Sequence, residues 1–312
     1  MENPTSDEKV LAALAHASVL FAFFGPVGPT LIWVFQRAKS KYVRFHALQA
    51  MGYQAMAFWA FFIGIFFAVF GGIIISIIIA SISHFDPSDM SAFPFIVQPI
   101  IMLSIFGLWS LFFLIGIIGA VFCMIGRNFS YPLIGHWLKG KLFGGQVTEE
   151  EMEELEDNWV SGVCHSTAIL QLWGVITPLI VWFSQKERSM KLRFQALQAT
   201  IYQLTAFAAY MIGTVAYMAF FFIMMFGVLA FSGPSASPNS KLSPIAGIIL
   251  IVFFSILMIF WLLMMVATPI YFILAAAASI LTIRGKNFKY PILGGIISRR
   301  IAPQKVEGTI QS

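Results

Sequence analysis

The sequence predicts an all-α integral membrane protein in which one membrane unit occurs twice in tandem. Of 312 residues, 59% are hydrophobic and only 11% are charged, and a polar motif of the first half recurs in the second half. Soluble domains carry about 25% charged residues, so charge is excluded from most of this chain. Four apolar runs, at about 55–82, 99–125, 204–231 and 245–283, exceed the roughly 20 residues that cross a bilayer core.

Two pairs of matching sequence motifs, which we call landmarks, identify the repeat. RFHALQAMGYQ, which begins at Arg44, matches RFQALQATIYQ, which begins at Arg193, and GRNFSYPLIG at 126–135 matches GKNFKYPILG at 285–294. Further residues match at the spacing of the first landmark: His16 with His165, Gly25 with Gly174, Pro29 with Pro178, and Trp33 with Trp182. Self-similarity of this kind indicates a duplicated structural unit.

The repeat divides the chain into two membrane units and a linker. We expect a first membrane repeat at 1–147, an acidic linker at 148–157 and a second membrane repeat at 158–312. The linker sequence TEEEMEELED predicts a solvated helix with Thr148 as its N-cap. The chain start, MENPTSDEK, lacks the basic region and cleavage site of a signal peptide, so the first apolar segment is expected to stay in the mature protein.

Each unit is predicted to contain one broken apolar helix followed by two long transmembrane helices. The first apolar segments, about 10–36 and 159–185, are interrupted by GPVGP and GVITP. Proline lacks a backbone donor and clashes with the preceding helical turn, and glycine adds backbone freedom. The residues expected to break the helix are Gly25, Pro26, Gly28, Pro29, Gly174 and Pro178.

The distribution of Lys and Arg between the two sides of the membrane favours a re-entrant topology for the broken segments. If each broken segment enters and leaves on one face, the two units are parallel, and 18 of the 19 Lys and Arg residues lie on one side with Lys241 alone on the other. Cytoplasmic loops hold the Lys and Arg excess, so this count favours a multi-pass protein of the cytoplasmic (inner) membrane with cytoplasmic basic loops. The alternative is six full spans with inverted repeats, which divides the same residues 11 to 8.

A polar stripe opens the second apolar helix of each unit. Positions spaced by three and four residues share one helix face. The stripes consist of His46, Gln49 and Tyr53 in the first unit and Gln195, Gln198 and Tyr202 in the second. One interpretation is a polar surface that faces a cavity between the units or binds a partner. The other is hydrogen bonding between packed helices, which membrane bundles use widely.

Two further pairs of polar residues lie near the membrane segments. His16 and His165 precede the helix breaks, and an embedded ionisable group is a functional hypothesis, although each histidine could instead cap a carbonyl group near the interface. Arg44 and Arg193 are expected at the membrane surface, because long basic side chains reach the headgroup phosphates there.

No catalytic machinery is visible in the sequence. Seven of the 14 acidic residues fall in 149–157 and none lies inside a long apolar helix, which disfavours ion-coupled transport. There is no nucleotide-binding loop, nucleophile elbow or zinc-protease motif. Among the His and Cys residues, Cys164 and His165 are the only pair close together in the sequence, and adjacent residues rarely bind one ion. We therefore expect no enzyme, no cofactor and no metal, with Cys123 and Cys164 buried and inert.

The expected partners follow from the same distribution of charge. Basic residues occur in short clusters beside apolar runs, which suits membrane lipid and excludes a nucleic-acid surface. A membrane-protein partner is a further possibility. The function predicted is that of a non-enzymatic polytopic membrane protein, either a translocon- or channel-like component with a polar cavity between the repeats or a structural assembly factor that binds partner transmembrane helices.

The order of these motifs resembles a known family. His16, the GPVGP break, Trp33, RFHALQA and the closing NFSYP are similar to a small bacterial membrane-domain family of unknown function, related to the twenty-kilodalton channel subunit of the chloroplast inner-envelope protein translocon. The resemblance covers both units and implies a membrane module, channel-forming in one reading and without catalysis. The second unit departs from the pattern at three places: Gln195 replaces His46, Thr177 replaces Gly28 and Val175 replaces Pro26.

Overall fold

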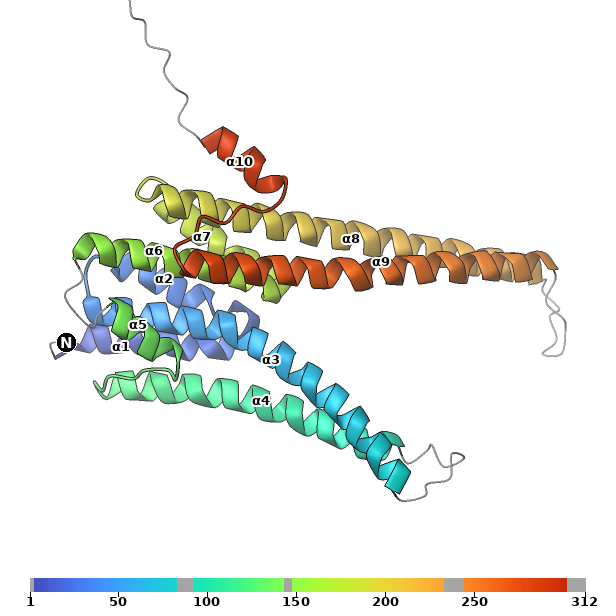
Figure 1. Cartoon of the computed structure of the whole chain (residues 1–312), viewed down its shortest axis with the longest axis horizontal. Helices are drawn as coiled ribbons and strands as arrows, with labels where there is room; N and C mark the ends of the chain where they lie inside the picture. The colour runs from blue at the N-terminus through green and yellow to red at the C-terminus, as the bar shows by residue number, and fades with distance from the viewer. Residues whose placement is uncertain (1–2, 83–92, 143–147, 233–243, 302–312) are drawn as a thin grey trace, which may run out of the picture.

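The described part of the computed structural model, residues 3–82, 93–142, 148–232 and 244–301, consists of helices joined by turns and short extended segments and contains no strand (Figure 1). The first unit consists of α1 (Ser6–Ala17), η1 (Ser18–Phe24), α2 (Val27–Gln36), α3 (Lys41–Ile82), α4 (Phe93–Met124) and α5 (Ile134–Leu142). The second consists of α6 (Glu149–Ser166), η3 (Thr167–Val175), α7 (Ile176–Gln185), α8 (Met190–Ser232), α9 (Pro244–Ile283) and α10 (Leu293–Ile301). The same order of elements in both units confirms the all-α tandem repeat.

Each unit begins with a helical hairpin. The chain turns at Ala22 (φ 49°) in the first unit and at the matching Gln171 (φ 52°) in the second. In the second unit the two arms of the hairpin are held together by Arg37 of the first unit, whose side chain contacts both Asp157, halfway along α6, and Gln185, the last residue of α7 (3.8 and 2.8 Å). Asp157 and Gln185, which lie on either side of the turn at Gln171, are therefore close in space, and the broken segment turns back on itself.

The prolines begin the returning helix and do not break the outgoing one. Pro26 directly precedes α2, and Pro29 and Pro178 lie in the first turns of α2 and α7. Proline is tolerated there because the first backbone N–H groups of a helix have no intrahelical acceptor. The break therefore does not lie at these prolines, as expected, but upstream of them, at Ala22 and Gln171.

The glycines of the predicted break allow close contact between the two arms of each hairpin. A Cβ atom on Gly174 would lie 1.9 Å from the carbonyl oxygen of Thr167, and one on Gly28 would lie 2.6 Å from the Cβ of Ser18. A Cβ atom on Gly25 would lie 2.8 Å from the Gln54 side-chain oxygen. These glycines are needed because the arms and the neighbouring long helix leave no room for a side chain.

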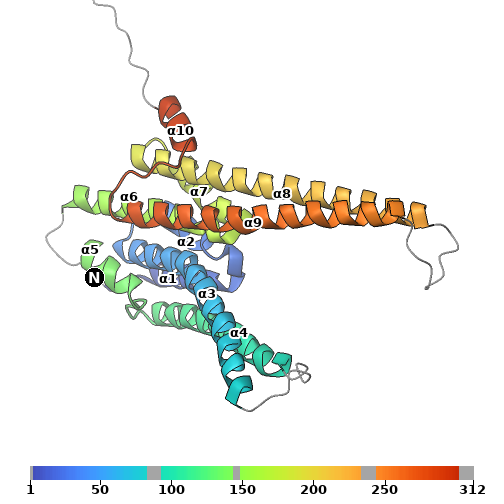
Figure 2. The same ribbon diagram turned by 45° about the vertical axis from the view of Figure 1, so that its right-hand side comes forward.

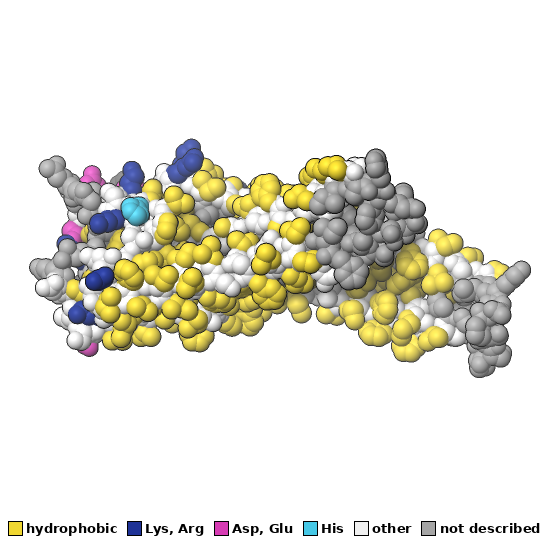
Figure 3. All heavy atoms as spheres, turned by 90° about the horizontal axis from the view of Figure 1, so that it is seen from below, with side chains coloured by type: hydrophobic (Ala, Val, Ile, Leu, Met, Phe, Trp, Pro, Cys, Tyr) yellow, Lys and Arg dark blue, Asp and Glu magenta, His cyan; other side chains and the backbone are white. Residues whose placement is uncertain are grey.

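The long helices form two antiparallel pairs, α3–α4 and α8–α9, which extend from a shared base and diverge (Figures 1 and 2). Charged side chains gather at the base, and the rest of the face seen in Figure 3 is largely apolar. Within the described residues five helical runs are long and apolar enough to cross a membrane. One of them, Glu149–Gln185, includes the α6–α7 hairpin and reverses direction at Gln171.

The two units are parallel. Lys41, at the start of α3, pairs with Glu149 (3.6 Å), and Arg188, just before α8, pairs with Glu153 (2.8 Å). Both long helices therefore start beside the first turns of α6, at what we call the basic end of the molecule. This arrangement agrees with the parallel prediction and differs from six uninterrupted spans with inverted repeats.

The acidic linker is part of a longer helix. Thr148 and Glu151 form a capping box, in which the Thr148 hydroxyl accepts from the Glu151 N–H (3.3 Å), so the predicted N-cap is confirmed. The helix α6 then continues to Ser166 without interruption. Glu156 and Asp157 are buried, so the expectation of a solvated linker is wrong for its last residues.

The turn at Ala22 provides a test of the hairpin. A non-glycine residue with positive φ costs about 1–3 kcal/mol, so Ala22→Gly is expected to raise the free energy of unfolding by about 1 kcal/mol. The measurement is thermal denaturation of the purified protein in detergent. The matched control, Ala13→Gly inside α1, should lower stability by about 1 kcal/mol. Equal losses in both variants would contradict a turn at Ala22.

Candidate functional site

The polar stripe of α3 binds the closing segment of its own unit. Gln49 is fully buried. Its amide nitrogen donates to the carbonyl of Phe129 (2.9 Å), and its side-chain oxygen accepts from the N–H of Tyr131 (3.1 Å). The side chain thus satisfies the extended backbone that follows α4.

The second unit repeats this arrangement. The amide nitrogen of Gln198 donates to the carbonyl of Phe288 (3.1 Å), and its oxygen accepts from the N–H of Tyr290 (3.0 Å). The two sequence landmarks of each unit therefore recur together because one binds the other.

The tyrosines of the stripes also point inward within their own units. Tyr53 stacks on Tyr131 with ring centroids 4.0 Å apart, and its hydroxyl donates to the carbonyl of Phe112 (3.0 Å). Tyr202 stacks on Tyr290 at 3.8 Å, and its hydroxyl donates to the carbonyl of Tyr271 (3.0 Å). The contacts of the stripes correspond to the packing interpretation, and a role in a cavity or in partner binding stays a prediction.

The two embedded histidines join the hairpin to this network. The Nδ1 of His16 lies 2.8 Å from the Tyr131 hydroxyl, and its Nε2 lies 3.0 Å from Nδ1 of His46. Both His16 and its counterpart His165 are fully buried. The Nδ1 of His165 lies 3.1 Å from the Tyr290 hydroxyl, and its Nε2 lies 2.9 Å from the Gln195 oxygen. These bonds are to side chains, so neither histidine takes the alternative role of capping a carbonyl.

Two glutamines that the sequence analysis did not single out satisfy the broken helices. The amide nitrogen of Gln54 donates to the carbonyl of Ala15 (3.0 Å), and that of Gln203 donates to the carbonyl of Cys164 (2.9 Å). A break frees carbonyl groups that need partners away from water. The signal was present, because Gln54 and Gln203 recur directly after the stripe tyrosines.

A buried ion-pair cluster joins the units at the basic end. Glu156 of α6 is fully buried and accepts hydrogen bonds from the Trp33 ring N–H and the Arg44 guanidinium, and Arg37 lies 3.6 Å from its carboxylate. Arg44 is buried, which corrects the expectation that it lies at the membrane surface. Arg193 is half-buried, and its membrane-surface role stays a prediction.

The interface beside this cluster is packed. The Trp159 ring N–H donates to the carbonyl of Leu48 (3.1 Å), and a Cβ atom on Gly52 would lie 2.1 Å from the Trp159 ring. Phe24 and Trp173, which occupy matching positions of the two units, contact each other with ring centroids 4.3 Å apart. Side chains fill the interface at these positions, where a polar cavity between the repeats was expected.

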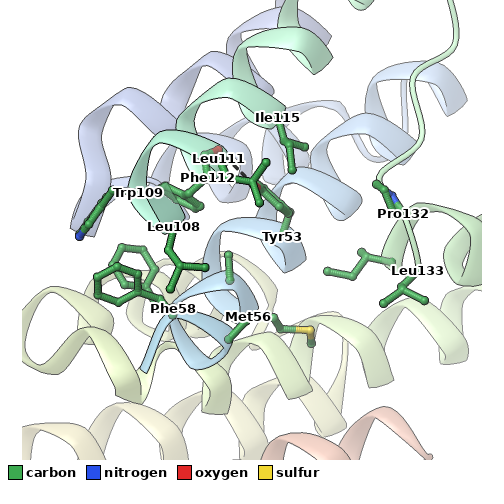
Figure 4. A pocket seen from close by; sticks show the side chains of 14 residues that line it. Tyr53, Met56, Phe58, Leu108, Trp109, Leu111, Phe112, Ile115, Pro132 and Leu133 are labelled. Carbon is green, nitrogen blue, oxygen red and sulfur yellow. Dashed lines mark hydrogen bonds between the residues drawn. The ribbon is translucent and has the colours of Figure 1, made fainter. Parts of the chain in front are cut away.

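Each unit has an apolar pocket between its long helices. The pocket of the first unit has a volume of about 410 Å³ and is lined by α3, α4 and the segment after α4, with Tyr53, Phe58, Trp109 and Phe112 on its wall (Figure 4). A pocket of about 310 Å³ lies at the matching place between α8 and α9 and includes Phe207 and Tyr271. Both linings are predominantly apolar, which suits an acyl chain or an apolar side chain more than a polar substrate.

One cluster has the chemistry of a metal site. His16, His46 and Cys123 each offer one ligand atom, and these atoms lie within 4.8 Å of one another. The expectation of no metal constellation rested on spacing along the chain, and it missed Cys123, which α4 brings beside His46. Both Cys123 and Cys164 are buried free thiols, as predicted.

The fold and these contacts define a polytopic, all-α membrane protein of two parallel repeats, each fastened internally by buried glutamines and tyrosines. The chain belongs to the magnetosome magnetite crystal formation protein family, whose sequence profile matches it twice, at residues 7–138 and 156–297. The double match corresponds to the two units. No curated protein and no solved structure matches the chain.

The buried carboxylate of Glu156 yields a stability prediction. Glu156→Gln removes the negative charge that faces Arg37 and Arg44, and an uncompensated buried charge costs about 3–5 kcal/mol. We expect a loss of about 3 kcal/mol, measured by thermal denaturation in detergent. Glu150 of the same helix is exposed, so Glu150→Gln should change stability by less than about 0.5 kcal/mol. Similar effects of both variants would contradict the ion-pair cluster.

Proposed function

We propose that the protein is a non-enzymatic structural membrane protein that associates laterally with transmembrane helices of other membrane proteins. Its family is named for magnetite crystal formation in magnetosomes, and we place the protein's assembly role in that process. The observation that carries the proposal is the length of its apolar helices.

The long helices exceed the thickness of a bilayer. α8 and α9 contain 43 and 40 residues, so each is about 60 Å long, whereas a bilayer hydrocarbon core is about 30 Å thick. Such a mismatch is relieved by tilting, by local thickening of the bilayer or by oligomerisation. Tilts rarely exceed about 40°. To lie within a 30 Å core, the apolar run of α9, at about 245–283, would need a tilt of about 60°, and that of α8, at about 204–231, a tilt of about 45°.

The apolar surface far from the basic end supports lateral association. Large side chains there are exposed on both helix pairs: Phe66, Phe67, Phe70, Ile74, Ile223, Phe226, Ile248 and Ile251. Exposed apolar surface of this kind needs cover from water, by lipid or by protein. Partner transmembrane helices would cover the part of this surface that one bilayer thickness leaves outside the hydrocarbon.

The hairpins fit a re-entrant position in the membrane. Their tips carry exposed apolar side chains, among them Leu20 and Phe21 of η1, which favour hydrocarbon over water. Their open ends lie at the basic end with the connectors that contain Lys39 and Lys186. We therefore place α1–α2 and α6–α7 as re-entrant hairpins and the basic end in the cytoplasm.

A channel- or translocon-like role is the second candidate, suggested by the sequence resemblance. It would require polar residues along a shared lumen, and the stripes that would line it, including Gln49 and Gln198, are buried inside their own units. The family match carries no reference to a translocon. The assembly role is therefore better supported.

Photo-crosslinking tests the assembly role with a matched pair of positions. Ile251 and Ile273 lie on α9 and are 68% and 66% exposed, but Ile273 is nearer the basic end, within one bilayer thickness. A benzophenone amino acid at position 251 should give protein adducts in native membranes, and one at position 273 should give mainly lipid adducts. The same two variants in liposomes of purified protein distinguish a foreign partner from a second copy, which would give an adduct of twice the chain mass.

Lipid adducts alone at both positions, in native membranes and in liposomes, would contradict the proposal. That result would mean that tilting or local thickening of the bilayer covers the long helices without a protein partner.

A further inference from the structure

The cluster of His16, His46 and Cys123 brings three helices of the first unit to one point. His16 comes from α1, His46 from the start of α3 and Cys123 from the end of α4. All three side chains are fully buried. Nδ1 of His46 lies 3.0 Å from Nε2 of His16 and 3.3 Å from Sγ of Cys123.

Nδ1 of His46 has more polar neighbours than it can bond. Besides His16 and Cys123, the amide nitrogen of Gln49 also lies 3.0 Å from the same Nδ1 atom. A ring nitrogen has one lone pair and accepts one good hydrogen bond. Gln49 does not depend on this contact, because its amide also donates to the carbonyl of Phe129 (2.9 Å).

The matching position of the second unit has no such conflict. There Gln195 replaces His46, and its side-chain oxygen, with two lone pairs, lies 2.9 Å from Nε2 of His165 and accepts from Gln198 (3.3 Å). The residue that matches Cys123 is Thr282, whose hydroxyl donates to the carbonyl of Ala278 (2.7 Å). At these two positions the second unit completes its hydrogen bonds with an amide and a hydroxyl. The first unit carries an imidazole and a thiol at the same places.

We propose that His16, His46 and Cys123 bind one thiophilic transition-metal ion, of which Cu⁺ and Zn²⁺ are the representatives. Thiolate and imidazole ligands select these ions. Metal–nitrogen and metal–sulfur bonds of about 2.0 and 2.3 Å place donor atoms about 3.3–3.6 Å apart, and the donor atoms here lie 3.0 to 4.8 Å apart. Small shifts of side chains would therefore form the site.

Binding has a defined proton balance. The ion replaces the thiol proton of Cys123, which passes to solvent at the nearby basic end, and the two imidazoles bind as neutral ligands. His16 then carries its remaining proton on Nδ1, which faces the Tyr131 hydroxyl at 2.8 Å. Such a contact orients a metal-bound histidine. One thiolate with Cu⁺ gives a neutral site, and with Zn²⁺ a site of charge +1.

Tyr42 supplies a further oxygen beside the cluster. It is buried, its hydroxyl has no hydrogen bond of good geometry, and its ring lies 4.5 Å from that of His46. Four-coordinate zinc would use this hydroxyl or a small ligand as its fourth donor, whereas three-coordinate Cu⁺ needs none. The ion would fasten α1, α3 and α4 together, a function that does not depend on the assembly role proposed above.

Metal titration of the purified full-length protein in detergent, under reducing conditions, tests the site. Zn²⁺ is titrated against a chromogenic chelator, Cu⁺ against a Cu⁺-specific chelator, and Co²⁺ is added as a probe of thiolate ligation by its absorption. We expect one equivalent of Cu⁺ or Zn²⁺ per chain and a rise in the thermal denaturation temperature on binding.

The second unit provides the variants. His46→Gln and Cys123→Thr install the residues that the same fold carries at Gln195 and Thr282, so they should fold, and each should weaken binding more than about 100-fold. The reverse change, Gln195→His with Thr282→Cys, should raise the stoichiometry from one to two. Absence of binding to the unaltered protein, or unchanged binding in both single variants, would overturn the proposal.

Discussion

The structure depends on one constraint: where a helix is interrupted inside an apolar environment, its free backbone groups must find hydrogen-bond partners in the protein. Each hairpin turn frees carbonyl groups, and an unpaired carbonyl in an apolar environment costs several kcal/mol. Gln54 and Gln203, each reaching from a long helix to a carbonyl of the broken one, meet this need. Because the glutamine belongs to the long helix, the same bond that permits the turn also fixes the hairpin against its unit. The parallel arrangement of the two units follows from that turn.

Comparison of the two units separates what the fold requires from what each unit has acquired. The residues that hold the frame are the same in both, as in Gln49 with Gln198 and Tyr131 with Tyr290. The residues of the interface differ, because Glu156 and Trp159 match the exposed Asp7 and Val10 of the first unit. Duplication has therefore kept the internal fastening and allowed the contacts between the units to become asymmetric.

Much of the fold could be predicted from the sequence, because apolar length, proline and basic residues act locally. The repeat, the long helices, the hairpins and the Thr148 cap all have such signals. The turning points could not be predicted, since an alanine or glutamine with positive φ has no local signature. Burial of Arg44 depends on Glu156, more than a hundred positions along the chain, and this partner is visible only in three dimensions.

The candidate site was predictable only in part. Gln49, Tyr53 and His16 recur as Gln198, Tyr202 and His165, and this recurrence of polar groups in apolar segments identified them. The meeting of Cys123 with His46 could not be predicted, because it depends on the register between α4 and α3, which the polar pattern does not encode. The partner that Gln195 and Gln198 share in the second unit, the carbonyl of Phe288, likewise emerges only from packing.

The central claim is that each unit turns back on itself, so that both connectors to the long helices lie on the same side of the membrane. Lys39 and Glu187 are exposed residues of these connectors, and the native cysteines are buried. Single cysteines at positions 39 and 187, labelled in intact cells and in inverted vesicles with a membrane-impermeant maleimide, report the side directly. Our account requires that both be labelled only from the cytoplasmic face; labelling of the two positions from opposite faces would contradict it.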